Sequence, residues 1–187
     1  MHMARAKEMM DWDSKYPFRD MGNGKVRGVG VAMAMQGSSI AGVDVGGADI
    51  KLNEDGSYTL ALGCTDMGTG CDTILSQMAA DVLHVSTDEI FVSGADTDNS
   101  PYDSGSYASS TTYITGQAVV KACTELERRI CKLAALMMEC DEEDVELEGH
   151  QVRNIKTGRS VTTEEVGFKA QSFNDFALQV TESHTSP

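Results

Sequence analysis

Apolar residues recur along the first third of the chain with the period of strands. Residues 43–52 and 58–62 alternate between apolar and polar or small positions, as strands with one buried face do. The Asp-Gly pair at residues 55–56 lies between them and is typical of a tight hairpin turn. A turn over residues 22–25 precedes an earlier apolar stretch, residues 26–35, which is also predicted to be a strand. The pattern therefore predicts several strands joined by short turns.

Helices are expected where the apolar period lengthens to 3.6 residues. One short amphipathic helix is predicted over residues 4–12, another over 70–82, and a longer one over 116–137. A short strand at 90–92 lies between the last two, and the Asp-, Ser- and Gly-rich residues 95–110 are predicted to be a long loop. This order predicts an α+β fold, a two-layer mixed β-sheet with two main helices packed on one face.

Shorter signals predict the rest of the chain. They indicate an exposed acidic edge strand within 139–148, a return strand at 152–155, a short helix opened by a capping box at Thr162 and Glu165, and a last strand at 173–180. Residues 1–25 are interpreted as an N-terminal helix and linker, and residues 26–187 as one domain.

The net charge of the chain argues against two classes of binding partner. Fifteen Lys and Arg against 29 Asp and Glu give a net charge of −14, and seven of the acids lie within residues 139–148. A surface this negative repels phosphate backbones and anionic lipid headgroups, so neither nucleic acid nor a membrane is expected as a partner. The acidic stretch is interpreted as a solvated strand edge, with an acidic docking patch as the alternative.

No segment has the composition of a membrane anchor or a secretion signal. The longest apolar runs, such as residues 133–138, are far shorter than the ~20 residues that span a bilayer. The first residues lack the apolar core of a signal peptide. A cytoplasmic protein is therefore expected.

The cysteines and histidines show no spacing typical of a metal site. The cysteines are odd in number and contain no Cys-x-x-Cys pair, so they are predicted to be buried reduced thiols rather than disulfides or zinc ligands. They are Cys64, Cys71, Cys123, Cys131 and Cys140. No metal ligand and no catalytic residue is predicted from spacing.

Two segments have the composition of an anion site. The glycine-rich residues 63–70 lead from a predicted strand into a helix, where free backbone N–H groups and the helix dipole favour an anion. The turn lacks the Lys of a nucleotide-binding phosphate loop, so a plain turn and an anion site both stay open. The hydroxyl-rich residues 103–112 approach the next helix, and there helix capping is the alternative to phosphate binding.

These segments belong to a longer series of motifs. In order, they are Arg-Gly-Val-Gly-Val-Ala from residue 27, Asp-Gly-Ser from 55, Met-Gly-Thr-Gly from 67, Gln-Met-Ala-Ala from 77, Ala-Asp-Thr from 95, Asp-Ser-Gly-Ser-Tyr-Ala-Ser from 103 and Thr-Gly-Gln-Ala-Val from 115. Their order and spacing resemble the large, molybdenum-binding subunit of the xanthine dehydrogenase and aldehyde oxidase family.

The resemblance implies a role for each segment. In that family the amides of the glycine turn lie along the pterin, and a Gln in the turn reaches the metal's oxo ligand. Here Thr69 replaces that Gln. The Ala-Ser segment of the family holds the pterin and its phosphate. The implied cofactor-binding residues are Met67, Gly68, Thr69, Gly70, Ala108, Ser109, Ser110 and Thr111.

The resemblance also implies an activity and partners. The chain is expected to be a molybdopterin-binding part of a molybdenum hydroxylase that acts on purines, other N-heterocycles or aldehydes. The molybdopterin is expected in a dinucleotide form, and the expected partners are the remainder of the molybdenum subunit and iron–sulfur and FAD subunits or domains. The Gly-x-Gly-Glu-Pro-like segment that carries the family's catalytic base is not in the sequence. The chain is therefore expected to be a fragment, inactive and without cofactor when isolated. The alternative is a non-catalytic binding or assembly module of the same fold that has lost the cofactor.

Overall fold

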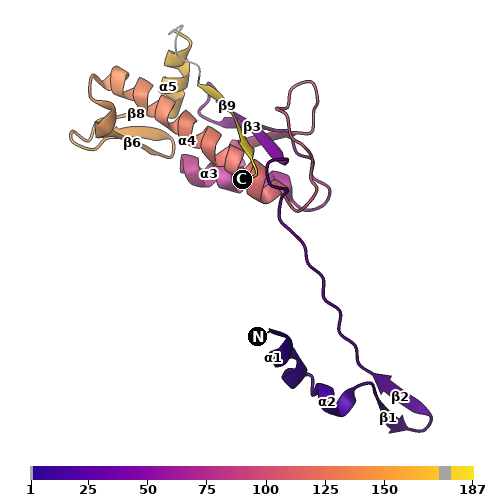
Figure 1. The fold of residues 1–187 in the computed structure, drawn as a ribbon. Coiled ribbons are helices and arrows are strands. Elements are labelled where there is room, and N and C mark those ends of the chain that lie inside the picture. The colour runs from indigo at the N-terminus through magenta and orange to yellow at the C-terminus, as the bar shows by residue number, and fades with distance from the viewer. Residues whose placement is uncertain (1, 173–177) are drawn as a thin grey trace. The chain divides into compact units, whose positions relative to one another are not determined.

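The chain divides into two compact units. The computed structural model describes residues 2–172 and 178–187, and the units are Met1–Gln36 and Gly37–Pro187 (Figure 1). The first compact unit thus extends to Gln36, past the domain limit after residue 25, which stays a prediction. The reason is that strand β2 (Lys25–Gly28) pairs within the first unit.

The first unit contains two short helices and a hairpin. Helices α1 (His2–Met9) and α2 (Trp12–Lys15) are separated because Asp11 takes a left-handed conformation, so the predicted single helix over 4–12 is interrupted. Strand β1 (Phe18–Gly22) pairs with β2 through the predicted turn.

The predicted strand over 26–35 is wrong beyond Gly28. Among the described residues, none forms a strand pair with residues 29–35, and Met35 is 99% exposed. A strand needs a partner in register as well as a suitable composition, and here the partner is missing.

Four strands of the second unit form a mixed sheet in the order β5-β4-β3-β9. Strand β3 (Val45–Leu52) pairs antiparallel with β4 (Tyr58–Leu62) through the predicted Asp-Gly hairpin. Strand β5 (Ile90–Gly94) lies parallel to β4, and β9 (Gln179–Thr185) closes the other edge antiparallel to β3. The last strand predicted at 173–180 falls partly on residues 173–177, which lie outside the described residues.

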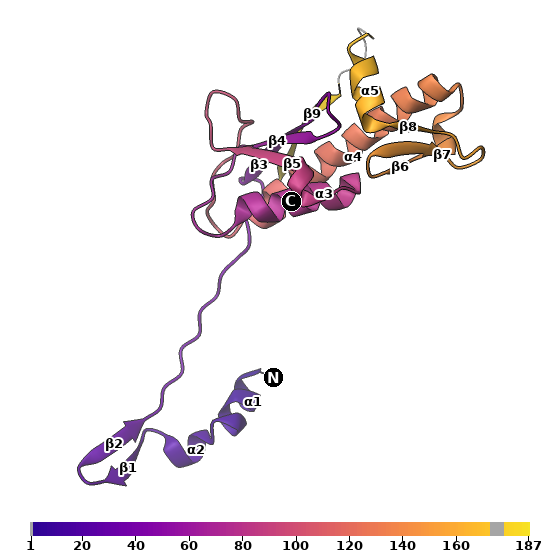
Figure 2. The same ribbon diagram turned by 180° about the vertical axis from the view of Figure 1, so that it is seen from behind.

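Helices α3 (Cys71–Leu83) and α4 (Thr111–Met138) pack on one face of this sheet (Figures 1 and 2). Their apolar stripes meet the alternating apolar positions of the strands in a solvent-free core. Its fully buried members include Ile50, Leu60, Leu62, Leu75, Leu83, Leu126, Ile130 and Leu133. The predicted α+β architecture is confirmed, although α4 begins five residues before its predicted start.

A second, three-stranded sheet packs against the far end of α4. It contains β6 (Val145–Glu148), β7 (Gln151–Asn154) and β8 (Ser160–Thr162), with β6 at an edge as predicted. The rest of the acidic stretch is not strand, since α4 runs to Met138 and a 3₁₀ turn covers Glu142–Asp144. Helix α5 (Thr163–Ala170) follows, and its predicted capping box is present.

The two long helices begin at the same end of the mixed sheet. Helix α3 follows the carboxyl end of β4, and α4 follows that of the parallel strand β5 through the 95–110 loop. Near its start α4 touches the first residues of β3, because a Cβ on Gly46 would lie 2.6 Å from Thr115 Cα. In the part of the chain that the structure describes, no helix has the length and apolarity needed to cross a bilayer.

Candidate functional site

Both segments singled out in the sequence lie at this end of the sheet. Residues 67–70 form the turn between β4 and α3, and residues 108–111 end the long loop and open α4. The carboxyl ends of parallel strands in an α/β unit are a common position for ligand sites, because loops and helix N-termini converge there. The topology thus brings the two segments to one edge of the domain.

Hydrogen bonds fix the serine-rich loop to this edge. Ser104 N–H donates to the Val45 carbonyl over 2.9 Å, and the Ser104 hydroxyl accepts the Val45 N–H over 3.1 Å. Thr115 donates its hydroxyl to Asp103 over 2.8 Å, and the Ser106 hydroxyl donates to the Thr65 carbonyl over 3.2 Å. The last bond joins the loop that carries one segment directly to the turn that carries the other.

Close packing at Gly63 holds the same two loops together. A Cβ on Gly63 would lie 2.3 Å from the Pro101 carbonyl oxygen and 2.6 Å from the Asp103 Cβ. Real Cβ contacts are not that short, so only glycine allows the loop to lie against the end of β4. The position of the serine-rich loop therefore depends on this residue.

The amides of the glycine turn already have an acceptor. The Asp66 carboxylate accepts the N–H groups of Gly68 and Gly70 over 2.8 and 3.1 Å. These two bonds lower the pKa of Asp66, so the carboxylate is ionised at neutral pH. An outside phosphate would have to displace this anion, and the turn is therefore a poor phosphate site.

The turn nevertheless leaves an open backbone surface. Gly68 and Gly70 have φ values of 99° and 76°, and a Cβ at either would meet no atom within 4 Å. The side chain of Met67 is 64% exposed, and Thr69 is exposed beside it. A flat, uncharged ring system can approach such a surface closely, whereas a side chain on Gly68 would occupy that space.

The start of α4 differs from the turn in its charge. Its first turn contains no acidic residue, and the N-cap Ser110 directs its hydroxyl to the Tyr107 carbonyl over 2.8 Å rather than to the helix amides. Ala108 and Ser109 both adopt left-handed conformations, with φ of 48° and 53°. Since the first turn of this long helix contributes no carboxylate of its own, and Asp103 bonds to the Thr115 hydroxyl rather than to the first amides, this helix end suits a phosphate group better than the glycine turn does.

The residues present therefore fit a ligand with a neutral ring and an anionic tail. Asp66 disfavours the tail at residues 67–70, and a helix whose own first turn contains no acidic residue favours it near residues 108–111. A pterin with its phosphate has this chemistry.

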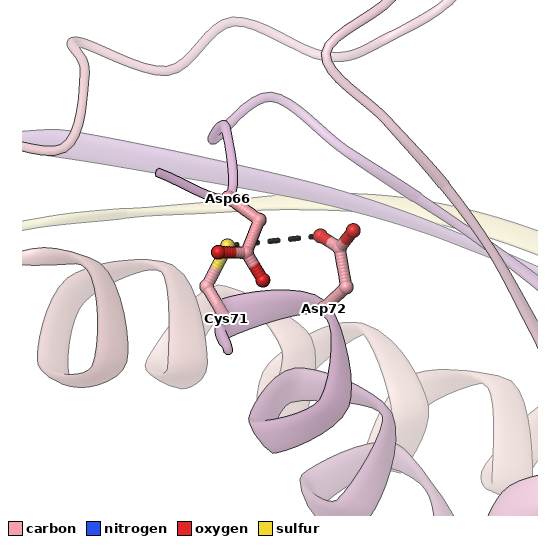
Figure 3. A group of neighbouring side chains, drawn as sticks. All are labelled: Asp66, Cys71 and Asp72. Carbon is pink, nitrogen blue, oxygen red and sulfur yellow. Dashed lines mark hydrogen bonds between the residues drawn. The ribbon is translucent and has the colours of Figure 1, made fainter. Parts of the chain in front are cut away.

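Cysteine thiols lie directly beneath the turn. Cys64 and Cys71 are both free and buried, with their Sγ atoms 4.0 Å apart. Burial is the main cause that raises the pKa of each thiol, and nearby carboxylates add to the effect. Cys71 also lies beside Asp66 and Asp72 (Figure 3).

Sequence reasoning missed the residues that support the site. Asp66 followed by glycines two and four positions later is a local signal for a side chain that caps its own turn, and it was available in the sequence. Asp103 and Ser104 had no such signal, because their partners Thr115 and Val45 lie 12 and 59 residues away.

Comparison with known proteins identifies relatives along nearly the whole chain. The profile of a family described as "Molybdopterin cofactor-binding domain" matches residues 5–186. "Probable hypoxanthine oxidase XdhD" of Escherichia coli K12 is 34% identical over 186 residues, which are 99% of this chain and 19% of that protein. The "Xanthine dehydrogenase molybdenum-binding subunit" of Escherichia coli O157:H7 is 31% identical over 140 residues, 73% of this chain and 19% of that protein.

A solved structure has the same fold. "Reconstituted CO dehydrogenase from Oligotropha carboxidovorans" superposes with a TM-score of 0.68 at 26% identity, covering 76% of this chain and 18% of that one. The chain thus spans about a fifth of the length of the relatives that it matches.

Proposed function

The chain belongs to the molybdopterin cofactor-binding domain family, within the xanthine dehydrogenase and aldehyde oxidase group, and on this premise we propose which of its residues hold the cofactor. Met67, Gly68, Thr69 and Gly70 bind the pterin ring through the open face of the turn. Ala108, Ser109, Ser110 and Thr111 bind the phosphate at the start of α4. The observation that carries the assignment is the Asp66 carboxylate on the turn amides, which disfavours a phosphate at the turn and so supports different roles for the two loops.

The residues of this chain position the cofactor rather than perform the chemistry. When bound, a molybdenum centre transfers oxygen to a substrate carbon and accepts its electrons. Thr69 replaces the Gln of the family and has a shorter side chain, so its hydroxyl would reach the metal's ligands only through a water molecule. The sequence contains no Gly-x-Gly-Glu-Pro-like segment, and the catalytic base must come from outside these residues.

The proposed activity belongs to a larger protein. Since XdhD and the xanthine dehydrogenase subunit are about five times as long as the matched region, we propose that the domain works within a longer molybdenum-binding subunit. The iron–sulfur and FAD partners of this proposal rest on the family resemblance alone. Its substrates are purines, other N-heterocycles or aldehydes, as in purine metabolism, its cofactor is a dinucleotide form of molybdopterin, and its compartment is the cytoplasm. The chain by itself is expected not to turn over hypoxanthine or xanthine.

Metal and pterin content test the assignment. Gly68→Val and Ser109→Ala are introduced into the complete molybdenum-binding subunit, expressed in a host that makes the cofactor, and bound molybdenum and pterin are measured per protein. Gly158→Val and Ser160→Ala are the controls. Gly158 has a similarly positive φ of 74° in open space, and Ser160 is exposed in the second sheet.

We expect Gly68→Val and Ser109→Ala to lose most of the cofactor and the controls to keep it. Normal loading in both site variants overturns the residue assignment. A wild-type subunit without molybdenum or pterin favours the alternative, a binding or assembly module of this fold that has lost the cofactor.

A further inference from the structure

A third segment of the chain lies against the residues assigned to the phosphate. Ser39 donates its backbone N–H to the carbonyl of Ala108 over 2.7 Å. Val45, six residues later, exchanges hydrogen bonds with Ser104 of the same serine-rich loop. Residues 39–45 therefore run along the loop that ends in residues 108–111, which we call the phosphate segment.

Ser186 holds this third segment from its other side. The Ser186 N–H donates to the Asp44 carbonyl over 2.8 Å, and the Ser186 carbonyl accepts the Gly42 N–H over 2.9 Å. The hydroxyls of Ser186 and Ser39 share a hydrogen bond of 2.8 Å. Ser186 and Asp44 are both buried, and Asp44 also accepts the Ile40 N–H through Oδ2 over 2.8 Å. The position of Ser39 is therefore set by a buried residue 147 positions further along the chain.

The phosphate segment needs support of this kind. Ala108 and Ser109 have φ values of 48° and 53°, which are disfavoured for residues that carry a Cβ. Such conformations persist only where the surrounding structure holds them. The two residues directly precede the N-cap Ser110, so they determine how the chain enters α4 and where the first amides of the helix lie. The bond from Ser39 acts on the first of this pair.

We propose that Ser39 and Ser186 are positioning residues for the phosphate of the cofactor. The Ser186 hydroxyl fixes Ser39, and the Ser39 N–H fixes the Ala108 carbonyl, so the phosphate segment keeps its conformation when the phosphate is absent. Neither residue has to touch the cofactor. The inference rests on the proposed function for the role of the phosphate segment, whereas the chain of hydrogen bonds is independent of it.

Hydrogen exchange in the purified chain tests the positioning without any cofactor. In Ser186→Ala, the Ser39 N–H should exchange at least tenfold faster by NMR, because it leaves the Ala108 carbonyl more often. The amides of β4 should keep their rates. Thr163→Val is the matched control, since it also removes a buried hydroxyl, one that donates to the His150 carbonyl over 3.3 Å at the start of α5. It should leave the Ser39 rate unchanged.

Cofactor release from the complete molybdenum-binding subunit tests the function. Ser186→Ala and Ser39→Gly should each lose bound pterin at least threefold faster than wild type, with kcat per bound molybdenum unchanged. Ser39 has a φ of 70°, so glycine relieves strain there and should not lower the free energy of unfolding. Faster release at unchanged stability then separates positioning from a purely structural role. The double variant should release no faster than the quicker single variant, because both changes break the same bond.

Three results would overturn the proposal at different points. An unchanged Ser39 exchange rate in Ser186→Ala overturns the positioning itself, whatever the cofactor does. Faster exchange with unchanged pterin release, in a subunit whose Ser109→Ala variant loses the cofactor, shows that the bonds serve only the fold. If Ser109→Ala keeps its cofactor, the assignment of the phosphate segment fails, and this inference fails with it.

Discussion

Gly63→Ala is expected to separate the serine-rich loop from the end of β4. The new Cβ would lie 2.3 Å from the Pro101 carbonyl oxygen, about 1 Å inside the closest ordinary carbon-to-oxygen contact of about 3.3 Å. The opposing atoms belong to backbone and to the Asp103 Cβ, so no flexible side-chain tip can move away. The loop as a whole must shift by about 1 Å.

The cost follows from that shift. Overpacking in a close-packed region typically costs about 1–3 kcal/mol, and a weakened Ser106–Thr65 bond falls within the same range. We expect a loss of about 2 kcal/mol in the free energy of unfolding. In a protein of this size this corresponds to a fall of about 4–8 °C in Tm.

Urea unfolding followed by far-UV circular dichroism measures this loss, with Gly94→Ala as the matched control. Gly94 lies at the same end of the neighbouring strand β5, and its Cβ would meet Asp72 Oδ1 at an ordinary 3.4 Å. The control should be neutral or slightly stabilised, because alanine restricts the unfolded chain. Equal unfolding free energies for the two variants would refute the packing of the loop on Gly63.

Three further predictions concern stability. Leu126→Ala, in the fully buried stripe of α4, should cost about 2–5 kcal/mol in urea unfolding, whereas Leu136→Ala, 55% exposed on the same helix, should stay within about 0.5 kcal/mol of wild type. Ser109→Gly should raise the free energy of unfolding by about 1 kcal/mol, because glycine relieves the left-handed strain at φ 53°; an unchanged or lower value contradicts that strain. Hydrogen bonds from Arg128 and Arg129 lower the pKa of Glu125 to about 2. The contribution of this carboxylate to the free energy of unfolding is therefore complete above about pH 4.5 and is lost as the pH falls toward 2. Glu125→Gln should therefore flatten the acid limb of the stability–pH curve, by no more than about 1 kcal/mol for a solvent-screened pair, and an unchanged limb would show that the pair does not form.

Local signals in the sequence predicted the elements that depend on near neighbours. The Asp-Gly hairpin, the capping box at Thr162 and the apolar stripes of α3 and α4 each arise from residues a few positions apart. The motif series that resembles the molybdenum-binding subunits is also a property of order and spacing, and the family match over residues 5–186 confirms it. Fold class and family were therefore readable from the sequence.

Tertiary structure alone decided what depends on distant partners. Residues 29–35 have strand-like composition but no strand partner among the described residues, while β9 pairs with β3 from more than 120 residues away. Strand pairing is set by register and burial across the fold, and these are not encoded in local periodicity.

The candidate site, too, was predicted only in part from the sequence. Its two loops were identified from residue types, because glycines leave backbone N–H groups accessible and hydroxyl side chains can bind a ligand. Only the folded chain shows that Asp66 already occupies the amides of one loop and that Cys64 and Cys71 meet beneath it. Composition determines which chemistry is available, but the distances between side chains decide which of it each loop can use.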